Sequence, residues 1–330
     1  MALTAQTKVL TLDWWKPANK LAKGDYVFDR NGKLVKVTMV QEYRQENCYE
    51  VTFNDYLTVC GDSKLGLPVE DLKYRKRLDE YKGLFKFTRP LKHYTVDDLL
   101  DLPLKSERDR LAYSVPTAQP LQLPHQDLPV PPFVFGFWFF NRKAHHVLNA
   151  PSGRHDEVVE RLKDYGYKIR LGRKRPGGRI EFTVSPTIES QLVPNIPQVV
   201  TNNYLLSSTE QRLELLSGIV LSKSAQYNPK TDWFRITSKN QPTISRIQML
   251  VESLGIRTSA EHNEKLGNFS LSFRTKHILL GKQQSPKLKV HHARRFITGI
   301  NKIPAQLCVH IETTSKDNTI LVGEGFIPCR

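Results

Sequence analysis

Apolar and polar residues alternate in short runs over residues 1–95. The passage GDYVFDRNGKLVKVTMV places an Asn31-Gly32 pair between two such runs, the strongest short-range signal of a β-hairpin. The same pattern continues in NCYEVTFNDYLTVCGDSKLGL, where β-branched and aromatic residues flank a turn near Asn54-Asp55. This region is therefore predicted to be an all-β module.

Residues 96–132 are predicted to connect two domains. They contain a short helical stretch, TVDDLLDL, and then the passage SVPTAQPLQLPHQDLPVPP. Proline lacks an amide proton and breaks both helices and sheets. Because six prolines occur in this passage, no regular structure is expected over 114–132.

Residues 133–287 alternate between helices and strands, and the alternation occurs twice. The first half is predicted to hold helices at 133–148 and 155–167 and basic strands within 168–184. The second half is predicted to hold helices at 209–221 and 242–256, with strands at 233–239 and within 268–280. Two helix–strand–strand–helix units of roughly eighty residues, about 133–200 and 201–287, indicate an internal pseudo-repeat.

Short strands return over residues 288–330. The simplest arrangement joins 1–95 and 288–330 into one β domain that the helical region interrupts. The predicted fold class is therefore α+β, with an all-β domain, a connector at 96–132 and a mixed domain at 133–287.

The chain is strongly basic, with a formal net charge of +16 and an isoelectric point near 9.6. Residues 125–287 hold 23 Lys and Arg against 13 Asp and Glu, so they carry +10 of this surplus. Such a surplus favours a polyanionic partner, most often nucleic acid. The alternative is a generally basic soluble protein.

Composition also indicates the cellular location of the protein and the state of its cysteines. No apolar run reaches the length of a membrane span and no signal sequence is recognised, so a cytosolic protein is expected. The four cysteines form no CxxC pair, which favours reduced thiols over disulfides or a zinc site. These cysteines are Cys48, Cys60, Cys308 and Cys329.

Six motifs in order resemble an intein of the Hedgehog/intein (Hint) fold that carries an inserted LAGLIDADG homing endonuclease. LTAQTKVLT, LAKGDYVFD, VCGDSKL and TILVGEGFIPCR resemble splicing blocks, and FGFWFFNR and RLELLSGIVLSKS resemble the two endonuclease helices. The resemblance covers nearly the whole chain and is closest to inteins of phage terminase and helicase genes. It implies a phage-encoded protein.

The resemblance also identifies the positions where splicing chemistry would be found. The first nucleophile position holds Ala2, whose methyl group cannot attack a carbonyl. The position of the catalytic histidine holds Lys64, and the chain ends in Cys329-Arg330 instead of His-Asn. His310, Glu312 and Asp317 lie near the late catalytic block. Loss of splicing is therefore expected.

The nuclease positions have changed in the same way. The acidic position of the first helix holds Asn141, flanked by Phe140 and Arg142 where the family has glycines, so altered helix packing is expected. Leu221 and Lys223 occupy the acidic positions of the second helix, so divalent metal binding and DNA cleavage are not expected. The positions at which the two helices would still pack are held by Gly136, Trp138 and Gly218.

In the family, basic strands form a saddle in the DNA major groove, where a β-ribbon reaches bases and phosphates. The candidate DNA-binding residues are Lys168, Arg170, Arg173, Lys174, Arg175 and Arg179 in the first half, and Arg235, Lys239, Arg274 and Lys276 in the second. A solvated hairpin, or one that meets an acidic protein, is the alternative.

Two other groups of residues could indicate a metal site or a protein interface. The neighbouring histidines at 145–146 and 291–292 point apart on a helix or strand, so no metal site is expected. Six aromatic rings over 133–140 are helix-core material whose density could also mark an interface.

The sequence thus predicts a catalytically inactive intein and homing-endonuclease descendant that binds double-stranded DNA and needs no cofactor. It is expected in the host cytoplasm, with virion association left open. One alternative is a structural component of a phage particle or nucleoprotein assembly, acting on phage structural or packaging proteins. The weakest alternative is an active site-specific endonuclease.

Overall fold

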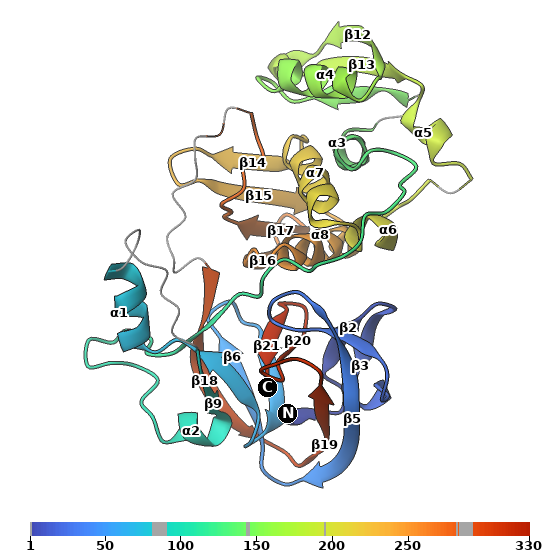
Figure 1. The fold of residues 1–330 in the computed structure, drawn as a ribbon. Coiled ribbons are helices and arrows are strands. Elements are labelled where there is room, and N and C mark those ends of the chain that lie inside the picture. The colour runs from blue at the N-terminus through green and yellow to red at the C-terminus, as the bar shows by residue number, and fades with distance from the viewer. Residues whose placement is uncertain (1, 81–90, 143–145, 195, 282, 284–292) are drawn as a thin grey trace. The chain divides into compact units, whose positions relative to one another are not determined.

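The computed structural model describes residues 2–80, 91–142, 146–194, 196–281, 283 and 293–330. The chain divides into two compact units (Figure 1): unit 1, residues 1–122 with 289–330, and unit 2, residues 123–288. Strands from both ends of the chain build unit 1, and helices packed on two small sheets build unit 2. The predicted α+β class is confirmed.

Unit 1 is built mainly from strands. They are β1 (Ala2–Thr4), β2 (Lys8–Thr11), β3 (Trp14–Pro17), β4 (Tyr26–Phe28), β5 (Leu34–Gln45), β6 (Cys48–Phe53), β7 (Thr58–Asp62), β8 (Gly66–Val69), β9 (Lys92–Thr95), β10 (Ser114–Pro116), β18 (Arg294–Ile303), β19 (Gln306–Thr313), β20 (Ile320–Val322) and β21 (Ile327–Cys329). The helices are η1 (Ala18–Lys20), α1 (Leu72–Glu80) and α2 (Val96–Leu100).

The main sheet of unit 1 interleaves the two ends of the chain. Its strand order is β10-β18-β6-β7-β1-β19-β5-β4-β2-β20-β21, with β3 beside β2. N-terminal strands therefore pair with C-terminal ones, as in the register Ala2↔His310 between β1 and β19. Leu3 and Val309, fully buried, belong to one hydrophobic core. The two terminal segments form one domain because neither can bury its apolar face without the other.

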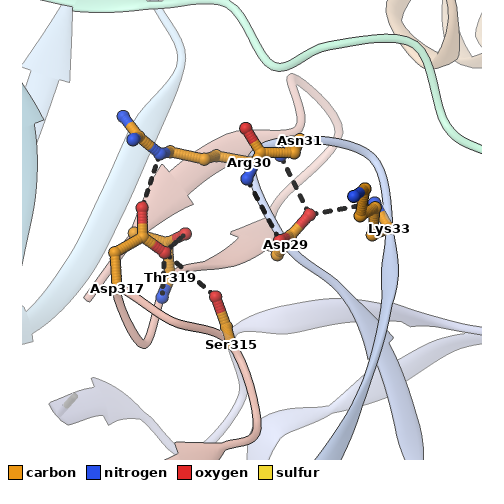
Figure 2. Close-up of polar contacts among 7 residues, drawn as sticks. All are labelled: Asp29, Arg30, Asn31, Lys33, Ser315, Asp317 and Thr319. Atoms are coloured by element: carbon orange, nitrogen blue, oxygen red, sulfur yellow. Dashed lines mark hydrogen bonds and ion pairs between the residues drawn. The ribbon is translucent and has the colours of Figure 1, made fainter.

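The predicted hairpin turn at Asn31-Gly32 is present between β4 and β5. Gly32 has φ +73°, and a Cβ there would lie 2.1 Å from the carbonyl oxygen of Pro120. The Asp29 carboxylate accepts hydrogen bonds from the backbone N–H groups of Asn31 and Lys33, both at 2.9 Å (Figure 2). The turn therefore requires glycine for its backbone conformation and for the close approach of the proline-rich segment.

Two predictions for unit 1 were wrong in part. Residues 1–95 are not all β, because α1 (Leu72–Glu80) lies within them. The proline-rich passage is not wholly irregular, since Ser114–Pro116 forms the edge strand β10 beside β18. Proline is compatible with an edge strand because its missing amide proton costs no ladder hydrogen bond on the open side. Residues up to 122 belong to unit 1.

Unit 2 contains two related halves. The first consists of α3 (Pro132–Asn141), β11 (Leu148–Ala150), α4 (His155–Asp164), β12 (Lys168–Lys174), η3 (Pro176–Gly178), β13 (Ile180–Ser185), α5 (Ile188–Gln191) and α6 (Asn202–Leu205). The second consists of α7 (Thr209–Val220), β14 (Ala225–Asn228), β15 (Trp233–Ser238), α8 (Gln241–Ser253), β16 (Thr258–Asn263) and β17 (Asn268–Phe273).

The second half opens in the predicted helix–strand–strand–helix order, α7-β14-β15-α8, and adds the hairpin β16-β17. The first half has one strand, β11, between its helices α3 and α4, and its hairpin β12-β13 is followed by the short helices α5 and α6. The first sheet has the order β11-β13-β12 and the second β14-β15-β17-β16. The predicted helix over 133–148 was too long, because α3 ends at Asn141 and β11 begins at Leu148. Within the second half, α8 packs against β15, β16 and β17.

Candidate functional site

The positions that the resemblance assigns to splicing chemistry come together in unit 1. Ala2, Lys64 and Arg330 line one cavity of about 620 Å³. The backbone N–H groups of Gly66 and Arg330 each donate to the other residue's carbonyl oxygen at 2.7 Å, which holds the C-terminal residue beside β8. Figure 1 shows both chain ends close together in this unit.

Most of the residues that line this cavity have polar side chains, although much of the surface they expose there is apolar. The lining consists of Ala2, Met39, Gln41, Tyr43, Gln45, Asp62, Lys64, Gly66, His93, Thr95, His310, Asn318 and Arg330. Cys329 is fully buried in β21 and is not part of the lining. Burial raises the pKa of the Cys329 thiol, so this group stays protonated and unreactive.

Asp62 is the acidic residue of this lining, and its carboxylate is already engaged. The Tyr43 hydroxyl donates to Oδ2 at 2.7 Å, and the Lys64 backbone N–H donates to Oδ1 at 2.8 Å. Burial and the bond to Asp62 raise the pKa of Tyr43, which therefore remains a donor. The pair supports the turn after β7 and provides no base for a water or a nucleophile.

The loop before β20 forms another part of this wall and is fixed by Asp317 (Figure 2). The Asp317 carboxylate is 2.5 Å from Arg30 Nε and accepts hydrogen bonds from the Ser315 and Thr319 hydroxyls at 2.9 and 2.7 Å. Although burial acts to raise the pKa of Asp317, these bonds and Arg30 lower it overall. Asp317 is thus a structural anchor, whereas His310 faces the cavity and lies 3.4 Å from Glu312.

In unit 2, helices α3 and α7 pack through glycine. A Cβ at Gly136 would lie 2.3 Å from the Leu215 carbonyl oxygen, and one at Gly218 would lie 2.1 Å from the Phe133 carbonyl oxygen. Close packing therefore persists at these two glycines even though positions 140 and 142 hold Phe and Arg.

The former acidic positions meet at the feet of these helices. Asn141 is fully buried; its Nδ2 donates to the Phe137 carbonyl oxygen at 2.8 Å and its Oδ1 accepts from the Lys223 backbone N–H at 3.1 Å. Leu221 is also fully buried. The Asn141 amide therefore links the two halves at the position that the resemblance assigns to a metal-binding carboxylate.

Other candidate metal ligands give no cluster in the described part of the chain. No group of three or more His, Cys, Asp or Glu residues there is arranged to hold an ion. His146 Nδ1 lies 3.1 Å from a Glu189 oxygen, while His145, His291 and His292 lie outside the described residues. All four cysteines are free, and the Cys48 and Cys308 sulfurs are 3.7 Å apart.

The aromatic rings of α3 belong to the core of unit 2. Phe133, Phe135, Phe137 and Trp138 are fully buried, and Phe135 stacks on Tyr204 with ring centroids 4.0 Å apart. Their burial agrees with the prediction that these rings are helix-core material, and it gives no support to the alternative that their density marks an interface. Rings from α4, α6 and β13 surround the helix, so more than one of its faces is covered.

The basic residues of the first half lie on an exposed hairpin, which we call the basic hairpin (residues 168–179). Lys168, Arg170, Arg173, Lys174, Arg175 and Arg179 are all exposed. β12 is an edge strand, and the turn runs through Gly177 and Gly178, which both have positive φ. Arg175 differs from the others because its guanidinium pairs with Glu181 at 3.0 Å.

The second-half candidates do not form one basic strand. Arg235 pairs with Glu261 at 3.0 Å and donates to the Ser270 hydroxyl at 2.7 Å, so its charge is balanced. Lys239 follows the end of β15, whereas Arg274 and Lys276 follow β17. Because β15 and β17 are antiparallel, Lys239 and Arg274 lie at opposite ends of the sheet.

Sequence reasoning missed the polar face of this second sheet. The register places the side chains of Arg235, Thr237, Ser270 and Ser272 on the face opposite to buried Phe234 and Ile236. The alternation in NFSLSF could have identified this face. On this face Ser270 and Ser272 are buried, whereas Arg235 and Thr237 are half-buried.

Structures similar to this chain fall into two classes, inteins and a homing endonuclease. The MchDnaB-1 intein is 26% identical over 21% of this chain and 53% of its own, with a TM-score of 0.20. The gp41-1 intein is 16% identical over 34% of this chain and 73% of its own (TM-score 0.23). I-DmoI, in a complex with DNA and Mn, is 13% identical over 44% of this chain and 89% of its own (TM-score 0.32).

These two classes are the ones that the sequence motifs resemble. The chain spans about half the length (53%) of the first intein structures that it matches. No protein-family model matches the chain, and no curated protein matches it. In the described part of the chain, no helix is long and apolar enough to cross a membrane.

Proposed function

We propose that this chain is a catalytically silent relative of inteins with an inserted homing endonuclease, and that it binds double-stranded DNA through the basic hairpin. The observation that carries the proposal is the exposure of six Lys and Arg side chains on one edge hairpin. Arg175 alone among the six has an ion-pair partner in the described part of the chain. Five cations thus remain available to phosphates.

The shape of the hairpin suits a duplex. A two-stranded β-ribbon fits the major groove, and successive side chains on one face of a strand can contact a phosphate and a base edge. Lys168 and Arg170 lie on one face of β12, since strand side chains alternate. Thr183 pairs with Arg170 across the hairpin and adds a hydroxyl to this face.

The proposal that the chain neither splices nor cleaves DNA rests on the residues at two positions. Ala2 has no nucleophilic atom at the start of the splicing segment, and Asn141 bonds to the Lys223 backbone instead of offering a carboxylate to a metal ion. Placed between two reporter proteins, the chain is expected to leave them unligated; ligated reporters would contradict this part of the proposal.

The DNA contact is tested by the salt dependence of duplex binding. Changing Arg170, Arg173 and Lys174 to Gln should flatten the slope of log K against log salt by about 2.7, because each phosphate contact contributes about 0.9. A control variant carries the same charge change on the exposed unit 1 residues Lys20, Lys23 and Lys36.

Two outcomes would count against DNA binding by the hairpin. One is an unchanged slope in the hairpin variant, and the other is an equal loss in the control variant. Either outcome would favour the alternative, a structural component of a phage particle that acts through protein contacts. Circular dichroism of both variants confirms that the fold is intact.

A further inference from the structure

Two cationic side chains, Lys64 and Arg330, and one carboxylate, Asp62, line the cavity in unit 1. In the described part of the chain, neither Lys64 nor Arg330 has an ion-pair partner, although both line this cavity. Asp62 is the acidic side chain of the lining, and its two oxygens accept from Tyr43 and from the Lys64 backbone. The side-chain charges of Lys64 and Arg330 therefore remain available to a ligand.

The lining also contains an imidazole nitrogen without a hydrogen-bond partner. Nε2 of His93 is buried and has no hydrogen-bond partner in the described structure. Burial, and then the positive charge of Arg330, lower the pKa of His93. The imidazole is therefore neutral near pH 7 and adds no positive charge to the cavity.

We propose that this cavity binds a small organic anion, with a carboxylate or phosphate group held by Lys64 and Arg330. Its volume of about 620 Å³ lies in the range of small-molecule sites. Arginine binds both kinds of oxyanion through two parallel hydrogen bonds, and lysine adds a point charge.

The rest of the lining defines the body of the ligand. Side-chain amides of Gln41, Gln45 and Asn318 supply both donors and acceptors, and Met39 adds one flexible apolar surface. A ligand body that combines hydroxyl or carbonyl groups with an apolar portion matches this mixed lining. This site lies wholly in unit 1 and does not depend on DNA binding by the basic hairpin in unit 2.

The test uses calorimetric titration of the full chain with citrate and, separately, with inorganic pyrophosphate. Saturable binding of at least one is expected, and the preferred probe identifies the oxyanion as carboxylate or phosphate. Lys64→Gln and Arg330→Gln should each weaken this binding about tenfold or more, the usual effect of losing one charge-assisted contact.

Arg44→Gln is the matched control. Arg44 lies on β5 between Tyr43 and Gln45, but its side chain points to the opposite face of the strand. Its removal should leave the affinity unchanged, as should the triple hairpin variant. The proposal is overturned if neither probe gives saturable heat, or if Arg44→Gln weakens binding as much as Lys64→Gln. Thermal unfolding of each variant confirms that it is folded.

Discussion

Gly218→Ala tests how tightly the two central helices of unit 2 are packed. The new Cβ would lie 2.1 Å from the Phe133 carbonyl oxygen and 2.8 Å from the Phe137 amide nitrogen. Both are backbone atoms of α3, which cannot rotate away. Since ordinary contact begins at 3.4 Å, α3 and α7 must separate by roughly 3.4 − 2.1 = 1.3 Å at this point.

The separation should outweigh the better helix propensity of alanine. Alanine favours a helix over glycine by about 1 kcal/mol, whereas overpacking a core costs about 1–3 kcal/mol and sometimes more. Here the shift also opens gaps around the fully buried rings of Phe133 and Phe137. The expected net effect is a loss of about 1–2 kcal/mol in the unfolding free energy of unit 2.

Urea unfolding read by hydrogen exchange measures this effect, because the amides of α3 and α7 report on unit 2 alone. Gly281→Ala is the control within unit 2: a Cβ there would have its nearest neighbour, the end of the Glu157 side chain, at 3.4 Å, so it should change stability little. If Gly218→Ala proves as stable as the unchanged chain, or more stable, the close helix contact is refuted.

Two further predictions follow from buried polar groups. Asn141→Asp should not create Mg²⁺- or Mn²⁺-dependent cleavage, which a cleavage assay measures. It should destabilise unit 2 by about 1–3 kcal/mol, because a carboxylate oxygen would then face the Phe137 carbonyl oxygen. Unfolding curves measure this loss. Burial, followed by the charges of Arg330 and Lys276, lowers the pKa values of His93 and His277 from 6.5. The contribution of these two histidines to the unfolding free energy should therefore be fully present above pH 6.5 and should fall as the pH decreases below that value. An unfolding free energy that rises as the pH decreases would contradict this.

Sequence patterning predicted the main division of the chain, although it missed α1 and β10 and gave too long a first helix in unit 2. Alternating apolar positions predicted the β module, and helical periodicity with Gly136 and Gly218 predicted the two helices that pack together. These features depend on where apolar and small residues recur along the chain. They are therefore visible without knowledge of the three-dimensional partner.

The chemistry of individual side chains was less accessible to sequence reasoning. Arg175 and Arg235 counted as available cations, yet Arg175 pairs with Glu181 on β13, and Arg235 pairs with Glu261 on β16, two strands away from β15. Those pairs depend on strand register, which one sequence does not specify. The same holds for Lys239 and Arg274, which antiparallel pairing sends to opposite ends of one sheet.

We propose that unit 2 binds duplex DNA and does not cleave it. The direct test is to incubate the unchanged chain with a library of DNA duplexes in the presence of Mn²⁺ or Mg²⁺. Fluorescence anisotropy reports binding, and sequencing of the same reactions reports new DNA ends. We expect DNA binding that weakens with salt, and no more new DNA ends than in a control without protein. Metal-dependent new ends, or an absence of binding even at low salt, would contradict the proposal.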